Sequence, residues 1–182
     1  MDINKIIREE YDNINGEIIV FHGTDNEFND FDLNKIGSGD GHSLGGWGIY
    51  FSDNSRVADQ YRSRRGVIKK YALRNGEYFD LDAAVESGSG DMIIQGLRRK
   101  RIDENEIEEF ENDYNVYGVN NKQALDWLTY VLGGEKQVSL FLRWLGFDGN
   151  HFMDKTIPNA NNFVVYNTDI IRDKNIEDEE DY

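Results

Sequence analysis

Two short stretches decide the fold of this chain: Val20-Phe21-His22-Gly23-Thr24 and Gly46-Trp47-Gly48-Ile49-Tyr50-Phe51-Ser52-Asp53. The first ends an apolar run, residues 18–21, that is typical of a buried strand, and a histidine and a glycine stand where this strand stops. The second predicts another short strand, residues 48–51, entered through a glycine-rich loop. A histidine beside bare backbone, with tyrosines nearby, suits a flat polar ring held in a slot.

A helix is predicted directly after the second strand. Ser52 or Asp53 is a suitable N-cap, and the helix is expected to run to about Arg64. This places Tyr61 on a helix that packs close to the strand carrying Tyr50. The two tyrosines are therefore candidates for the walls of one slot.

Composition narrows the class of protein. The 182 residues are 38% hydrophobic and 13% aromatic, which is enough for one domain with a sizeable core. No apolar run approaches the ~20 residues that a membrane-spanning helix needs, and the first residues lack a signal-peptide layout. We expect no membrane contact and a cytoplasmic protein, and the absence of cysteine agrees with a reducing compartment. Three histidines, without a His-Xaa-Xaa-Xaa-His pair, predict no metal site.

The net charge of −15 disfavours bulk binding of nucleic acid, because so acidic a chain repels the phosphate backbone. Two basic islands stand out: Arg62–Arg65 with Lys69-Lys70, and Arg98–Arg101. Two interpretations stay open for them. They are either solvated faces that balance an acidic chain, or local contacts for a phosphate group or an acidic partner.

Strands and loops alternate in the outer parts of the chain. A short helix is predicted over residues 1–12, and a long glycine-rich loop over residues 25–46; such a loop is usually functional or mobile. The expected strands are residues 17–21, 48–51, 67–73, 78–81, 150–153 and 162–167. After Ile176 the chain ends in an acidic tail.

Between residues 82 and 145 the spacing of apolar residues is helical. Turns at Gly88–Gly90, Gly118 and Gly133-Gly134 separate the helices. This pattern predicts a block of helices set between strands. Trp127 and Trp144 lie in this block and are interpreted as helix-packing residues.

Four motifs in order resemble the ADP-ribosyltransferase superfamily: His22-Gly23-Thr24, Gly46-Xaa-Gly48-Ile49-Tyr50-Phe51, Ala58-Xaa-Xaa-Tyr61, and Asn162-Phe163-Val164-Val165-Tyr166. The branch is that of poly(ADP-ribose) polymerases and diphtheria-like toxins, which is defined by a histidine, a tyrosine and a glutamate. The chain is most similar to the ADP-ribosyltransferase domains of phage polyvalent proteins and related toxins. These share the stretch Phe28-Asn29-Asp30-Phe31-Asp32. The resemblance is dense over residues 18–61, returns over 145–172 and is absent from about 82–144.

The resemblance implies an α+β fold in a single domain, residues 1–175. Two small antiparallel sheets are expected to form a split β-sandwich around an NAD cleft. Residues 82–144 are expected to be an inserted helical subdomain, and residues 176–182 an acidic tail.

The resemblance also implies roles for individual residues. The backbone of Gly23 is expected to hold the nicotinamide amide, and His22 to bind the adenosine ribose. Thr24 adds a hydroxyl contact to the dinucleotide, and Tyr50 and Tyr61 sandwich the nicotinamide ring.

The third catalytic position departs from the branch. The glutamate that precedes an aromatic residue on the last strand is replaced here by Asn162, which carries no charge and cannot act as a base. His22, Tyr50 and Asn162 are thus the candidate catalytic residues. Asp154, in the preceding loop, is the alternative source of a carboxylate.

The function implied is mono-ADP-ribosylation of a macromolecule, most readily a protein, with NAD as co-substrate. The resemblance implies a phage effector or toxin in the cytoplasm of a bacterial host. There it would modify host proteins or disarm a defence complex such as a CRISPR effector. Two alternatives remain: a catalytically weak acidic binding module that mimics nucleic acid, and NAD hydrolysis without a target.

Overall fold

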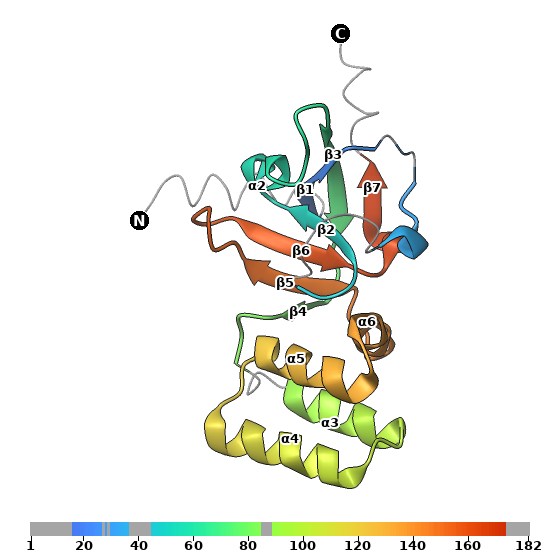
Figure 1. The fold of residues 1–182 in the computed structure, drawn as a ribbon, viewed down its shortest axis with the longest axis vertical. Coiled ribbons are helices and arrows are strands. Elements are labelled where there is room, and N and C mark those ends of the chain that lie inside the picture. Colours follow the sequence, from blue (N-terminus) through green and yellow to red (C-terminus); the bar gives the residue numbers. More distant parts are fainter. Residues whose placement is uncertain (1–15, 27, 29, 37–44, 85–88, 174–182) are drawn as a thin grey trace.

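The structure of the protein is a computed structural model that describes residues 16–26, 28, 30–36, 45–84 and 89–173. Seven strands form one sheet, and a group of helices lies at one end of it (Figure 1). The strands are β1 (Glu17–Thr24), β2 (Ile49–Ser52), β3 (Val67–Arg74), β4 (Tyr78–Asp80), β5 (Gly149–Met153), β6 (Asn161–Val165) and β7 (Ile171–Asp173). The predicted α+β fold is confirmed.

The sheet is divided between β1 and β2. Its strand order is β4-β5-β6-β2-β1-β3-β7. β1 pairs with β3 along its whole length, and β2 pairs with β6 along its whole length. A single residue pair, Phe21 with Ser52, joins β1 to β2. The two sheets expected from the sequence are therefore halves of one curled sheet that separate beyond this pair.

The pairing of the strands differs from the expectation in one further respect. β4 and β5 run parallel, whereas the other neighbouring strands in the described part of the sheet are antiparallel. A parallel pair requires a long crossover connection, and here the helices provide it. The helical block thus leaves the sheet after Asp80 and returns at Gly149.

The chain continues past the strand that was predicted to be the last. β6 ends at Val165, and a 3-10 turn, η3 (Thr168–Ile170), leads into β7 beside β3. Asn167 starts this turn, because its side chain accepts a hydrogen bond from Asp169 N–H and donates one to Asp148 Oδ1 at 2.6 Å. A three-residue edge strand is too short to show a period of two in the sequence.

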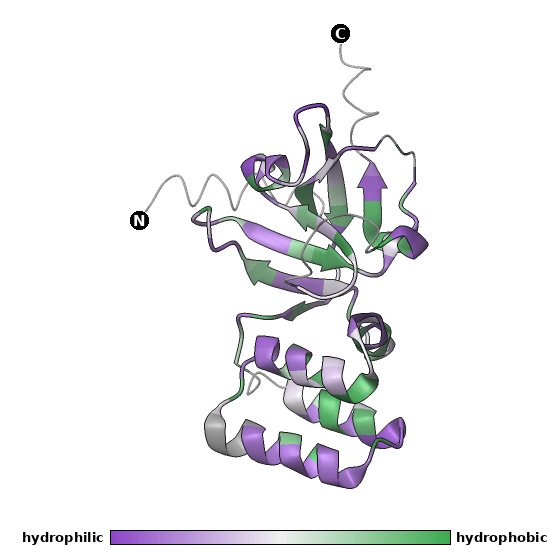
Figure 2. Cartoon of the chain, in the orientation of Figure 1, coloured by the Kyte–Doolittle hydropathy of each residue, from purple (hydrophilic) through white to green (hydrophobic). Residues whose placement is uncertain are grey.

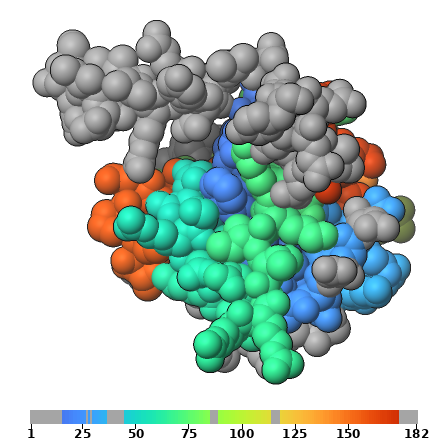
Figure 3. All heavy atoms as spheres, turned by 90° about the horizontal axis from the view of Figure 1, so that it is seen from above, coloured from blue at the N-terminus to red at the C-terminus, as the bar shows by residue number. Residues whose placement is uncertain are grey.

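The helix after β2 is much shorter than expected. α2 spans Ser55–Asp59 and not the range to Arg64, so Tyr61 lies in the turn that follows. Its N-cap is Asn54, whose side chain accepts a hydrogen bond from Arg56 N–H at 3.0 Å. Figure 3 shows this segment at the surface beside β1 and β3.

The two residues expected to cap that helix hold a strand in place. Ser52 Oγ donates to Asn161 O at 2.8 Å, and Asp53 Oδ1 accepts from Asn161 N–H at 2.8 Å. Asp53 Oδ2 also accepts from Asn161 Nδ2 at 2.6 Å. These bonds fix the start of β6, and with it the position of Asn162.

The predicted block of helices is confirmed. It consists of α3 (Ser89–Arg99), α4 (Glu104–Tyr117), α5 (Asn121–Leu132) and α6 (Glu135–Trp144). Asn120 begins α5 with a reciprocal capping box to Gln123, which satisfies two backbone N–H groups at the helix start. The visible side of α4 is largely hydrophilic, as its acidic sequence requires (Figure 2).

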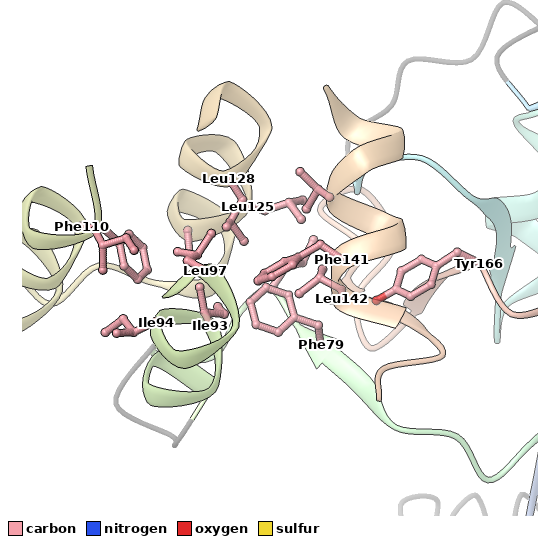
Figure 4. Close-up of a cluster of buried hydrophobic side chains, with 14 residues drawn as sticks. Phe79, Ile93, Ile94, Leu97, Phe110, Leu125, Leu128, Phe141, Leu142 and Tyr166 are labelled. Carbon is pink, nitrogen blue, oxygen red and sulfur yellow. The ribbon is translucent and has the colours of Figure 1, made fainter. Parts of the chain in front are cut away.

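One buried cluster binds the helices together and attaches them to the sheet (Figure 4). Leu97 and Phe110 are buried within it, while Phe79 of β4 and Tyr166 after β6 extend it to the sheet. Trp127 stacks on Phe110 with ring centroids 4.5 Å apart, as a packing residue should. Trp144, by contrast, is half exposed, so it lies at the edge of the block and is not part of its core.

A second cluster lies against the curled sheet. Its buried members are Val20, Ile49, Phe51, Tyr71, Leu73, Phe163, Val165 and Ile170. The helix predicted over residues 1–12, residues 37–44 of the glycine-rich loop and the acidic tail lie outside the described residues. Within the described ranges, no helix has the length and apolar content to cross a membrane.

We expect the sheet and the helices to unfold together, because Phe79 and Tyr166 belong to the helical core. Leu97→Ala should then lower the unfolding free energy of the whole chain by about 2–5 kcal/mol, the usual cost of this change in a core. Urea unfolding followed by circular dichroism, with amide exchange of β1 and β3, measures this. Leu140→Ala, on an exposed face of α6, is the control and should change stability by less than about 0.5 kcal/mol. Protection of β1 and β3 that survives loss of the helices would contradict the expectation.

Candidate functional site

A cavity of about 1020 Å³ lies where β1 and β2 separate. Its walls come from the ends of both strands, the described part of the loop after β1, and α2 with the turn that follows. Six residues singled out in the sequence line it together: His22, Gly23, Thr24, Tyr50, Tyr61 and Asn162. The structure therefore brings the predicted residues to one place, while their roles stay predictions.

His22 is held in one orientation by the backbone of the opposite half of the sheet. Its Nδ1 lies 2.7 Å from Tyr50 O, and because a carbonyl only accepts, Nδ1 must carry the hydrogen. Burial lowers the pKa of His22, and the positive charge of Lys69 lowers it further. The hydrogen bond to the Tyr50 carbonyl acts in the opposite direction and raises the pKa. A neutral ring with Nδ1–H leaves Nε2 as a hydrogen-bond acceptor.

Aromatic rings surround the imidazole of His22. Phe28, Phe31 and Phe51 have ring centroids 5.9, 5.4 and 5.6 Å from it. Lys69 on β3 anchors the loop that carries two of these rings: its Nζ donates to Phe28 O at 2.5 Å and lies 4.5 Å from the Phe28 ring centroid. Sequence reasoning placed Lys69 in a basic island only, and no local pattern reveals this contact.

Gly23 is required by packing. A Cβ atom at this position would lie 1.9 Å from Ala58 O, so only glycine allows α2 to approach β1 this closely. The family resemblance implies a different reason for this glycine, the approach of a bound nicotinamide ring, which stays a prediction. At the next position, Thr24 Oγ1 accepts from Asn26 N–H at 3.1 Å, which closes the turn into the loop.

The ring of Tyr50 is fixed through its hydroxyl group. The hydroxyl donates to Gly46 O at 2.8 Å and accepts from Gly45 N–H at 3.1 Å. Asn150, fully buried on β5, in turn donates from Nδ2 to Gly45 O at 2.6 Å and accepts from Tyr166 Oη at 3.3 Å. Sequence reasoning missed Asn150, and β5, which also contains His151, has no local pattern that reveals it.

Tyr61 forms the more solvent-exposed wall of the cavity, since 49% of its surface is exposed. Burial raises the pKa of Tyr61, and the negative charge of Asp154 raises it further. Asp154 is therefore close enough to act electrostatically on a residue that lines the cavity. Arg62, from the first basic island, also lines the cavity but is paired with Asp59 at 2.5 Å.

The two candidates for the third catalytic position are in contact with each other. Asn162 Nδ2 donates to Asp154 Oδ2 at 3.0 Å. Asp154 Oδ1 accepts from Thr156 N–H, Thr156 Oγ1 and Ile157 N–H at 2.8, 2.7 and 2.9 Å. Partial burial raises the pKa of Asp154, but these hydrogen bonds outweigh it and lower the pKa to about 2. The carboxylate is thus ionised at any ordinary pH.

Within the described residues, no group of three or more histidine and acidic side chains has the arrangement to hold a metal ion. The residues that line the cavity also include Asp25, Asp30, Asp32, Glu135, Lys35 and Arg62, so the cavity offers hydrogen bonding, aromatic stacking and charges of both signs.

A family model described as ADP-ribosyltransferase in polyvalent proteins matches residues 13–179. The chain belongs to this family. The match includes the six predicted residues that line the cavity. It also spans the helical block, so the expectation that the resemblance is absent from about residues 82–144 is wrong. Among curated proteins and among solved structures, no match to the chain was found. The resemblance inferred from the four motifs is confirmed.

We expect NMR of this member of the family to show the Nδ1–H tautomer of His22 and a pKa below the ordinary value of 6.5. A lowered pKa means that the unfolded state binds more protons than the native state below pH 6.5. The native protein should therefore lose stability as the pH falls through 6.5, and His22→Ala should lose less. Urea unfolding at pH 5 and pH 7 measures the difference. An Nε2–H tautomer, or a raised pKa, would contradict this account of the site.

Proposed function

We propose that this protein transfers single ADP-ribose units from NAD to a protein target. Membership of the family supports ADP-ribosyl transfer in general, and members of this superfamily use NAD as the substrate. The observation that carries the proposal is the cavity itself. A neutral histidine, two tyrosines and an amide line it together, and these groups suit a neutral carboxamide, a flat ring and ribose hydroxyls.

In this proposal each residue makes one contact with NAD. The backbone of Gly23 binds the nicotinamide amide, and the rings of Tyr50 and Tyr61 flank the nicotinamide. His22 Nε2 accepts a hydrogen bond from a hydroxyl of the adenosine ribose, which the Nδ1–H···O bond to Tyr50 makes possible. Asn162 contacts a hydroxyl of the nicotinamide ribose.

The reaction needs little acid or base catalysis at its first step. The bond between ribose C1′ and the nicotinamide nitrogen breaks, and its electron pair leaves with nicotinamide, which becomes neutral. The ribose gains oxocarbenium character, as in glycoside cleavage. A nucleophile of the target then attacks C1′ and loses its proton. The protein contributes orientation of the dinucleotide and electrostatic stabilisation of the developing positive charge.

Asn162 in the third position favours single transfers over chains. An amide can hold a ribose hydroxyl, but it cannot remove a proton from the hydroxyl of an attached ADP-ribose. Elongation of a polymer is therefore not expected.

We place this activity in a phage effector or toxin that acts in the cytoplasm of a bacterial host. There it would modify host proteins or a defence complex such as a CRISPR effector. The family's description, in polyvalent proteins, and the resemblance to phage and toxin domains support this setting. The second candidate is a catalytically weak acidic binding module. The uncharged Asn162 and the net charge of −15 favour it.

The deciding experiment incubates the protein with NAD labelled in the adenylate moiety and with a bacterial lysate. We expect labelled protein and released nicotinamide. His22→Ala and Tyr61→Ala should each lower transfer by about 10²-fold or more, because a displaced dinucleotide loses both binding and orientation. Tyr130→Ala is the matched control for Tyr61→Ala, since Tyr130 is 78% exposed on α5 and does not line the cavity.

Each outcome separates the candidates. Nicotinamide release without labelled protein indicates NAD hydrolysis. Neither product, from a folded protein, supports the binding module. Wild-type transfer by folded His22→Ala would show that the cavity is not the active site.

A further inference from the structure

The first inference rests on the proposed function and concerns the missing glutamate. We propose that Asp154 is a positioning residue that acts through Asn162, so that the two side chains together replace one glutamate. Asn162 supplies the oxygen that faces the ribose, and Asp154 supplies the negative charge behind it.

The orientation of the Asn162 amide follows from its partner. An ionised carboxylate only accepts hydrogen bonds, so the amide must turn Nδ2 toward Asp154 Oδ2, at 3.0 Å. The remaining polar atom, Oδ1, is then left for the cavity that Asn162 lines. Without a charged partner the amide could rotate by half a turn and present N–H groups instead. Asp154 therefore makes Asn162 an acceptor, as a glutamate oxygen would be.

Asp154 is itself held rigidly. Three hydrogen bonds from Thr156 and Ile157 reach its Oδ1, and its backbone N–H donates to Ala160 O at 2.8 Å. The loop between β5 and β6 thus places the carboxylate before any ligand binds. Its charge also acts on Tyr61 and raises the pKa of that phenol, which puts Asp154 on the side of the cavity where the nicotinamide is expected.

The test compares Asp154→Asn in two backgrounds. In the wild type, Asp154→Asn should lower the kcat of nicotinamide release by about 10-fold or more with little change in KM for NAD. In the Asn162→Glu background a second carboxylate stands beside Asp154, and two neighbouring carboxylates cannot both ionise freely. There Asp154→Asn removes the repulsion and should raise kcat.

A reversal of sign between the two backgrounds is the expected result. If Asp154 only stabilises its loop, the substitution acts in the same direction in both, which would overturn the proposal. The Asp154→Asn change keeps an acceptor oxygen for the loop, so the substituted proteins should fold in both backgrounds.

A second readout does not depend on turnover. The side-chain amide of Asn162 should give NMR signals that exchange slowly with water in the wild type and quickly in Asp154→Asn. Fast exchange in both proteins would reject the orienting role. Slow exchange in a wild type that releases no nicotinamide would instead reject the proposed function and keep the contact.

A different observation carries a second inference, about the outer surface of α3 and α6. We infer that this surface binds an acidic partner protein, and that in the proposed function this partner is the acceptor. We define the α3/α6 face by its exposed residues: Met92, Arg99, Lys100, Lys136, Leu140, Arg143 and Trp144.

The two helices form one continuous surface. A Cβ at Gly96 of α3 would lie 2.9 Å from both Phe141 and Leu145, so the helices touch there. Lys100 Nζ, just after α3, lies 5.0 Å from the ring centroid of Trp144 on α6. Leu140 and Trp144 are one helical turn apart, and 46% and 48% of their surfaces are exposed. Two large apolar side chains and a group of cations thus share one face.

The face continues to the mouth of the cavity. Ser139 Oγ of α6 donates to Trp47 O at 2.6 Å, and Lys136 Nζ lies 5.2 Å from the Trp47 ring centroid. Trp47 lines the cavity, as does Glu135 at the start of α6. A protein bound to the α3/α6 face would therefore stand beside the opening from which an acceptor must approach.

The charges of the face indicate the partner. The net charge of the chain is −15. The α3/α6 face nevertheless carries four cationic side chains, and none of its seven defining residues is acidic. In the described part of the chain none of these cations forms an ion pair with an acidic side chain. Arg98, which belongs to the basic run in the sequence, points elsewhere and bonds to Glu104 and Glu111 at 2.8 and 3.1 Å. An acidic partner is repelled by most of the molecule and attracted here.

The test uses a variant with Lys100→Glu, Lys136→Glu and Trp144→Ala. The control carries Arg64→Glu, Arg74→Glu and Tyr130→Ala at exposed positions outside this face, so that both proteins undergo the same change of charge and lose one aromatic ring. The probe is a fluorescent random copolymer of glutamate and tyrosine, and binding is measured by anisotropy across a salt series. We expect the dissociation constant to rise by about 10-fold or more in the variant only, with a weaker dependence on salt.

Nicotinamide release from NAD should stay within about twofold of wild type in both proteins, because none of the changed residues lines the cavity. Equal binding of the copolymer by the variant and the control would overturn the inference. That result would leave the proposed function intact, since the binding measurement needs no turnover.

Discussion

The hydrogen bond between His22 Nδ1 and Tyr50 O spans the line where the sheet divides. Next to this bond, Phe21 and Ser52 form the one residue pair that joins β1 to β2. Beyond that pair, β1 and β2 are not paired with each other. The cavity lies where the strands separate, and the imidazole bridges the two halves there. The same bond assigns the hydrogen to Nδ1 and leaves Nε2 open. A single contact thus links the architecture of the sheet to the chemistry that the cavity can perform.

Most of the framework is readable from the sequence because it depends on local patterns. The apolar run before His22, the short apolar strand around Tyr50 and the helical spacing between residues 82 and 145 each specify an element without reference to the rest of the chain. The elements that were misjudged are short. α2 ends after five residues, and β7 has three, so neither develops a period that distinguishes it from a turn.

The site was only partly readable, because its geometry depends on contacts across the fold. The motifs predict that His22, Gly23, Tyr50 and Asn162 lie together, and all four line one cavity. The bond between Asn162 and Asp154 depends on how the loop between β5 and β6 folds back, and the anchoring of Phe28 by Lys69 joins residues 41 positions apart. Likewise, Ser52 and Asp53 are suitable helix caps in the sequence. In the structure their side chains instead bond to the backbone of Asn161 and fix the start of β6. Polar side chains have several possible partners, and tertiary structure selects among them.

The parallel pairing of β4 with β5 has a consequence for how such a protein can diversify. The chain leaves the sheet at Asp80 and re-enters it at Gly149, and strand spacing and rise put these points roughly 8 Å apart. A connection whose ends lie so close can vary in length and sequence without shifting any strand, provided that it still covers Phe79 and Tyr166. Evolution can therefore rebuild the outer surface beside the cavity mouth, where we propose that a partner binds, while the strands that hold His22, Tyr50 and Asn162 are inherited unchanged.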